Sequence, residues 1–196
     1  YTATHLTTEA AARYLLNSLD IPTEGSKVLF LPCSPFDNFP NFLTASVFHG
    51  LVSLLGDGVV DVPEYEYAYR YQNVDPAEEV RVRGSMWGQG YTLGFKLPRR
   101  PHLNRMNISQ RIRSGEFDLI VFGRASPYEP CNFWYSYGGR DLTVPQFFED
   151  VYGRYPRERV ALLYGDDSGL DDAVVRTHAS RMGALHRGLG YIFMRE

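Results

Sequence analysis

Five short apolar runs constrain the fold of this chain more than any other feature. They lie at 27–32, 58–62, 117–122, 159–164 and 190–194, and four of them are almost entirely apolar. Runs of this length are typical of strands buried on both faces of a parallel sheet. Segments with helical spacing separate most of them. The pattern therefore predicts an α/β fold, a three-layer α/β/α sandwich with a mainly parallel, Rossmann-like sheet.

The first two helical segments carry recognisable end signals. Residues 8–18 place apolar side chains on one face, and Thr7 or Thr8 can cap the helix. A second helix is predicted from the candidate cap Asn41 to the stop signal Gly56.

Two long segments, about 64–104 and 124–142, lack a regular period and are predicted as irregular excursions from the sheet. A helix is predicted between them at 107–114, and another is predicted to begin at the cap Thr143. No internal repeat or interdomain linker is evident. We therefore expect residues 1–196 to form one Rossmann-like domain, which could be the N-terminal lobe of a larger two-lobe protein.

Composition indicates which classes of protein this chain can belong to. The chain is 44% hydrophobic and 22% charged, as in ordinary globular domains, and no apolar run approaches the roughly 18–20 residues of a membrane span. A pI of about 6.0 disfavours a nucleic-acid partner, since such domains usually have a pI above about 9. Two cysteines outside a C-x-x-C motif and no recognisable signal peptide point to a reducing compartment. We expect a cytoplasmic protein.

The net charge of −3 conceals segregated charges. Eight basic residues and no acid lie in 81–113, six acids and one arginine in 61–79, and eight acids and three arginines in 141–172. The basic stretch could bind phosphate, anionic glycans or lipid head groups. Internal pairing with the acidic segments is favoured, because it neutralises opposite charges in a chain whose net charge is near zero.

Small and polar residues follow three of the predicted strands. In an open parallel sheet, ligands bind beyond the carboxyl ends of the strands. Ordinary turns are the alternative explanation, since Gly, Ser and Asp dominate turns. The candidate ligand-binding residues at these ends are Cys33, Ser34, Asp37, Gly123, Arg124, Gly165, Asp166 and Asp167.

Several catalytic signatures are absent. The segment Cys33–Asp37 has no glycine with which to hold a dinucleotide, and the chain contains no Walker A, H-E-x-x-H or nucleophile-elbow sequence. Asp166 and Asp167, with Asp171 and Asp172, could hold a hard cation, but solvated loop carboxylates are favoured because the EF-hand spacing is not met. The prediction is no metal and no cofactor.

The candidates for acid–base chemistry are one histidine and three carboxylates. His102, inside the basic stretch, has the best claim to be a general base, whereas His49 lies among core-facing helix positions and is expected to be packed. The catalytic candidates are therefore His102 and the carboxylates Asp37, Asp166 and Asp167.

Two aromatic loops, 85–97 and 128–140, carry Trp87 and Trp134. Sugar rings stack on such flat apolar faces, so both tryptophans are candidates for the rim of a carbohydrate site. Packing of the loops against the domain, or a contact with another subunit or partner protein, is an equally good interpretation.

Six groups of segments, taken in order, resemble the N-terminal half of bacterial two-lobe (GT-B-type) glycosyltransferase-like proteins, over roughly residues 27–196. The resemblance implies that a second lobe would hold most of a nucleotide-sugar donor and that this lobe would face the acceptor. The chain differs in ending at Glu196 and in carrying the aromatic loop Tyr128–Arg140. The segments are Phe48–Leu51 with Val59–Pro63, Trp87–Leu93, Glu116–Gly123, Tyr155–Pro156 with Arg159–Val160, Tyr164–Asp167 and Gly190–Glu196.

Two functions follow. The leading one is a glycosyltransferase-like lobe that binds a glycan acceptor or a nucleotide-sugar-type ligand, catalytic only with a second lobe. In such an enzyme a carboxylate deprotonates the acceptor hydroxyl, and cationic groups stabilise the leaving phosphate. The alternative is a non-catalytic structural or interaction protein, a repurposed lobe that self-associates or binds a partner through its aromatic loops.

Overall fold

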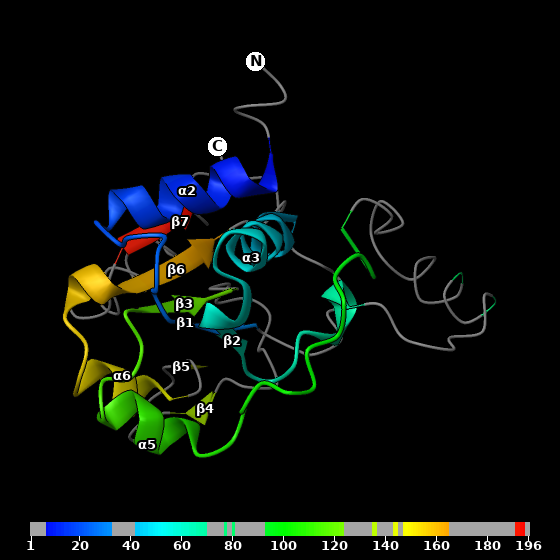
Figure 1. The fold of residues 1–196 in the computed structure, drawn as a ribbon. Helices are drawn as coiled ribbons and strands as arrows, with labels where there is room; N and C mark the ends of the chain where they lie inside the picture. The colour runs from blue at the N-terminus through cyan, green and yellow to red at the C-terminus, as the bar shows by residue number, and fades with distance from the viewer. Residues whose placement is uncertain are drawn as a thin grey trace, which may run out of the picture.

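The five predicted strands form one parallel sheet in the computed structural model of the chain (Figure 1). The structure describes residues 7–32, 42–69, 77, 80, 93–123, 135–136, 143–144, 147–164 and 191–194. The strand order is β2-β1-β3-β6-β7. The strands are Val28–Leu31 (β1), Val59–Asp61 (β2), Leu119–Phe122 (β3), Val160–Tyr164 (β6) and Tyr191–Met194 (β7).

Helices cover both faces of this sheet. Helices α2 (Thr8–Ser18) and α3 (Phe42–Leu55) lie on one face, and α5 (Ile108–Arg113) and α6 (Phe148–Tyr152) lie on the other (Figure 1). The predicted three-layer α/β/α architecture is confirmed. Among the described helices, none has the length and hydrophobicity needed to cross a bilayer.

Alternation along the strands produces two apolar cores. Val28 and Phe30 of β1 face α2 and α3, whereas Leu29 and Leu31 face α5 and α6. Every residue of β1 is buried, as is every residue of β3. Burial on both faces explains why these strands appear in the sequence as unbroken apolar runs rather than as alternating patterns.

The strand order reverses between β1 and β3. The chain passes from β1 to β2 on one side and then to β3 on the other, so β1 has a parallel partner on each side. Leu31 is in register with Phe122, and the Gly123 amide donates to the Leu31 carbonyl over 2.9 Å. The carboxyl ends of β1 and β3 therefore lie side by side at a topological switch point.

Local end signals act as predicted at several helix boundaries. The Thr7 hydroxyl accepts a hydrogen bond from the Ala10 amide over 3.0 Å and caps α2. Gly56 and Gly115 follow α3 and α5 with φ of +54° and +74°, a left-handed conformation that glycine adopts without steric cost.

The predicted cap at Thr143 is wrong. Thr143–Val144 forms a short strand (β5) that pairs antiparallel with Tyr135–Ser136 (β4), and α6 begins only at Phe148. β-Branched residues suit an extended backbone, and the pairing gives that backbone hydrogen-bond partners. The strand pairing at Thr143 was not predicted from the sequence, and it prevents Thr143 from capping a helix.

Part of the predicted excursion 64–104 belongs to the core. Tyr65, Tyr67 and Tyr69 are buried beneath α3, and the Tyr65 ring meets the Phe48 ring edge-on at 5.3 Å. The returning chain is held against them, since the Phe95 amide donates to the Tyr67 carbonyl over 2.9 Å. This tyrosine-rich segment extends the apolar layer beyond β2.

Candidate functional site

The carboxyl ends of β1 and β3, where the strand order predicts a ligand crevice, lie close to the first turn of α3. The buried Thr44 hydroxyl donates a hydrogen bond to the Gly123 carbonyl at the end of β3. The amino end of a helix carries a partial positive charge and free N–H groups. The helix is thus attached to the sheet edge at which ligands bind in open α/β folds.

Gly123 is the predicted binding residue that the structure describes at this edge. A Cβ atom there would lie 2.9 Å from Thr44 Cγ2 and 3.2 Å from two carbons of the Phe30 ring. Close packing of α3 against the end of β3 therefore requires glycine at this position. The structure thus assigns Gly123 a packing role at the predicted place.

The other candidates at the carboxyl edge and the rim lie outside the described residues. The described parts of β1, β3 and β6 lead directly toward the predicted segments, and all three strands run parallel. Their contribution to a site stays a prediction. These candidates are Cys33, Ser34, Asp37, Trp87, Arg124, Trp134, Gly165, Asp166 and Asp167.

His102 lies at the opposite edge of the sheet. Its Nε2 atom is 3.0 Å from Asp57 Oδ1, and Asp57 precedes β2 in the short 3-10 helix Gly56–Gly58. Both side chains are exposed. The structure places this candidate base with an acid partner at the amino ends of the strands, away from Gly123.

Internal pairing accounts for the described arginines of the basic stretch. Arg99 contacts Glu64, Arg100 and Arg105 contact Asp61, Arg111 contacts Glu116, and Arg113 contacts Asp150. Asp61, Glu64 and Asp150 belong to the acidic segments with which the sequence analysis favoured pairing, whereas Glu116 lies outside those segments.

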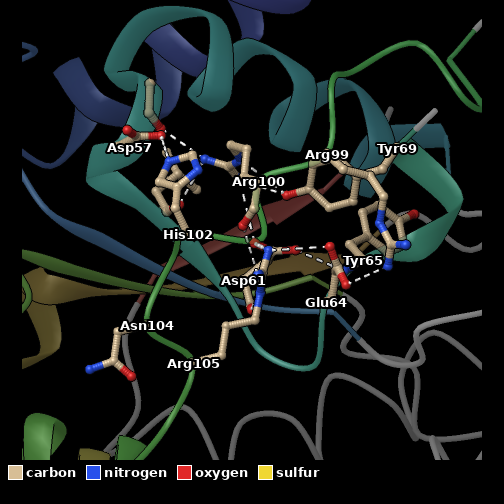
Figure 2. Close-up of polar contacts among 12 residues, drawn as sticks. Asp57, Asp61, Glu64, Tyr65, Tyr69, Arg99, Arg100, His102, Asn104 and Arg105 are labelled. Atoms are coloured by element: carbon tan, nitrogen blue, oxygen red, sulfur yellow. Dashed lines mark hydrogen bonds and ion pairs between the residues drawn. The ribbon is translucent and has the colours of Figure 1, made fainter. Parts of the chain in front are cut away.

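Asp61 is the centre of a buried network that sequence reasoning missed (Figure 2). The side chain is fully buried; Oδ1 lies 2.9 Å from Arg105 Nη2 and 3.4 Å from Arg100 Nη2. Oδ2 accepts a hydrogen bond from the Tyr65 amide over 2.8 Å. We define Asp61, Arg100, Arg105 and Tyr69 as the edge-strand cluster. An acid inside an otherwise apolar strand was the available signal for it.

The edge-strand cluster completes the hydrogen bonding of β2, which lies at the end of the sheet. Arg100 Nη1 donates to the Val59 carbonyl and Arg105 Nε to the Asp61 carbonyl. Arg100 Nη2 also donates to the Tyr69 hydroxyl over 2.6 Å, and burial raises the pKa of Tyr69, so the phenol stays neutral. With its donors occupied, Arg100 serves to protect an open sheet edge.

His49 is buried in α3, as predicted. Only 8% of the residue is exposed, and its Nε2 atom has no hydrogen-bond partner in the part of the chain that the structure describes. Burial lowers the pKa of His49, because the imidazolium would lose its hydration. The residue acts as a neutral core side chain rather than as a proton-transfer group.

The described side chains include no group of three or more His, Cys, Asp and Glu residues arranged to hold a metal ion. The positioned features of the candidate site are therefore the paired carboxyl ends of β1 and β3, the first turn of α3 and Gly123. Comparison of the chain with models of known protein families, with curated proteins and with solved structures finds no match.

Proposed function

We propose that this chain is a glycosyltransferase-like lobe that binds a glycan acceptor or a nucleotide-sugar-type ligand in the crevice beyond β1 and β3. One observation carries the proposal: the strand order reverses between these two strands, with their carboxyl ends in register. Such switch points are where open parallel sheets bind their ligands.

The surroundings of the switch point suit a phosphorylated ligand. The first turn of α3 lies against the end of β3 through Thr44, which directs a positive helix end toward this edge. Arg124 follows Gly123 directly in the sequence, and a guanidinium can bind two oxygens of a diphosphate. A carboxylate from Asp37, which follows β1, would then be available to the acceptor hydroxyl.

The experiment is a binding panel measured by thermal stabilisation and titration calorimetry. The panel contains nucleoside diphosphates, nucleotide sugars and neutral oligosaccharides at millimolar concentration. A rise in the melting temperature with the nucleotide sugars or the oligosaccharides is expected. No shift with any member would overturn the proposal.

Arg124→Ala sharpens this test. We expect it to weaken nucleoside diphosphate binding about tenfold, the value of one charge-assisted hydrogen-bonded contact. The matched control is Arg113→Ala, because Arg113 lies on α5 and pairs with Asp150 at the protein surface. Equal losses in both variants would indicate nonspecific charge attraction and contradict a site beyond β3.

A further inference from the structure

A pocket of about 640 Å³ lies at the amino ends of the strands, at the opposite edge from the proposed ligand crevice. The loop 23–27, the end of α3, residues 102–104 and Arg111 of α5 contribute to its lining. The volume falls within the range of roughly 300–1,000 Å³ that is typical of small-molecule sites. Nothing in the proposed function uses this pocket.

Charged groups are distributed along the pocket in the order of the strands. Asp57 precedes β2, Lys27 precedes β1, and Glu116 precedes β3, while the sheet order is β2-β1-β3. Adjacent strands are about 4.8 Å apart, so the ends of β2 and β3 are separated by about 10 Å.

The end near β2 is acidic. Among the residues that the structure describes, Asp57 forms an ion pair with the exposed His102, and about two thirds of its side chain remains exposed. Helix α3 ends beside it with Leu54 and Leu55, and the carboxyl end of a helix carries a partial negative charge. This end of the pocket favours a cation (Figure 2 shows Asp57 and His102).

The end near β3 has an excess of one positive charge. Arg111 holds the Glu116 carboxylate with two hydrogen bonds of 2.8 Å, and Lys27 Nζ lies 3.5 Å from the same carboxylate. Among the lining residues at this end, one acid therefore faces two cations, while the Asp118 carboxylate, outside the lining, accepts a hydrogen bond from the Lys27 amide. Lys27 is more than half exposed, and its ammonium has three donors for this one long contact within the described part of the chain.

Three apolar side chains, Leu55, Val60 and Leu103, also contribute to the lining of the pocket. The whole lining, with Glu24 included, carries three carboxylates against the two permanent cations Lys27 and Arg111. A purely anionic ligand would meet this acidic excess, whereas a purely cationic ligand would leave the Lys27 end unmatched.

We propose that the pocket binds a small zwitterion with an aliphatic chain, its ammonium group at Asp57 and its carboxylate at Lys27. Lys27 Nζ lies 3.5 Å from the Glu116 carboxylate, which precedes β3, so the Lys27 ammonium extends toward β3, whereas Asp57 precedes β2. A short ω-amino acid carries both charges on an aliphatic chain. The Leu55, Val60 and Leu103 side chains contact its methylene groups.

The test is a titration of the whole chain with γ-aminobutyrate, followed by the amide NMR signals of Lys27, Gly58 and Leu103. Butylamine and butyrate are the matched probes, since each lacks one of the two charges. We expect saturable binding of γ-aminobutyrate, with the two single-charge probes at least tenfold weaker. No saturation by γ-aminobutyrate, or equal binding of butylamine or butyrate, would overturn the proposal.

Two variants test which residue binds each charged end of the ligand. Asp57→Asn and Lys27→Met should each weaken γ-aminobutyrate binding about tenfold, and neither should alter the response to nucleoside diphosphates at the opposite edge. Asp150→Asn is the control, because Asp150 is an acid of α6 outside the pocket. Unchanged affinity in both pocket variants would show that the zwitterion binds elsewhere.

Discussion

Two clusters in this protein each join one carboxylate to two cations, yet they differ in their access to water. In the edge-strand cluster, Asp61 is fully buried and the Arg100 side chain is 6% exposed. In the second, which we call the amino-edge cluster, Glu116 is 28% exposed and Lys27 is 56% exposed. Similar charges are therefore placed in two different environments.

The difference determines what each cluster can do. The Arg100 donors bind carbonyls of Gly56 and Val59 as well as Asp61 and Tyr69, which leaves little capacity for a ligand. Among the residues that the structure describes, the Lys27 ammonium in the amino-edge cluster contacts Glu116 at 3.5 Å, and Lys27 lines a pocket. We infer that the buried edge-strand cluster stabilises the fold, whereas the exposed amino-edge cluster is available to bind a ligand.

The largest effect is expected when the edge-strand cluster is broken. Arg100→Met keeps much of the side-chain volume but leaves Asp61 with Arg105 as its ion-pair partner and removes the donors to Gly56 and Val59. A buried charge that loses a partner destabilises a protein by about 3–5 kcal/mol, measured as the free energy of unfolding in urea. Arg99→Met, at a side chain 42% exposed, is the control and should cost less than about 1 kcal/mol.

A smaller loss is expected in the amino-edge cluster. Arg111→Met removes two hydrogen bonds to Glu116 and the stacking of the guanidinium on the Phe117 ring at 5.0 Å. Water and Lys27 still solvate the carboxylate, so we expect a loss of about 1–2 kcal/mol in urea unfolding. A loss as large as that of Arg100→Met would contradict the distinction between the two clusters.

The pH dependence of stability tests burial at His49. The unfolded chain takes up this proton near the usual pKa of about 6.5, whereas the folded chain does so only at lower pH. The contribution of His49 is therefore complete above about pH 6.5 and is lost as the pH falls from there toward the folded pKa.

Thermal unfolding between pH 7.5 and 5.5 measures this contribution. His49→Gln should reduce the decrease in melting temperature on acidification, because the variant has no buried imidazole to protonate. A decrease equal to that of the parent chain would show that burial of His49 does not contribute to the acid sensitivity.

The smallest effect is expected at the surface pair of Arg113 and Asp150. Their contact is 2.7 Å, but the Arg113 side chain is 68% exposed. Exposed pairs contribute about 0.2–1 kcal/mol and are screened by salt. A double-mutant cycle with Arg113→Ala and Asp150→Ala should give a coupling energy in this range that decreases in 1 M salt. A larger coupling energy that does not change with salt would show that a short contact distance, rather than burial, determines the strength of an ion pair in this protein.

Much of the fold follows from local sequence patterns. The apolar run at 117–122 contains β3, and the cap Thr7 and the stop signal Gly115 act at the ends of α2 and α5. These signals work because they depend on neighbouring residues. Thr143 failed as a cap because its backbone pairs with Tyr135–Ser136, which precede it in the chain, whereas a capping signal is recognised from the residues that follow it.

The candidate site was predictable only in outline. The strands that lead to it were identified from their apolar runs, and Gly123 lies at the carboxyl end of β3 as expected, but its contact with Thr44 joins residues 79 positions apart. The edge-strand cluster was even harder to predict from the sequence. That Asp61 would meet Arg100 and Arg105, rather than other cations of the basic stretch, depends on the path of the chain around β2.

The sequence by itself determined that this chain builds a parallel α/β sheet. A strand that is buried on both faces requires a continuous run of apolar residues, and such a run can be identified directly in the sequence. Only the tertiary structure decided which charges pair and which edge of the sheet contains a described pocket. Those outcomes depend on distances between residues far apart in sequence and on exclusion of water, which sets the strength of each ion pair.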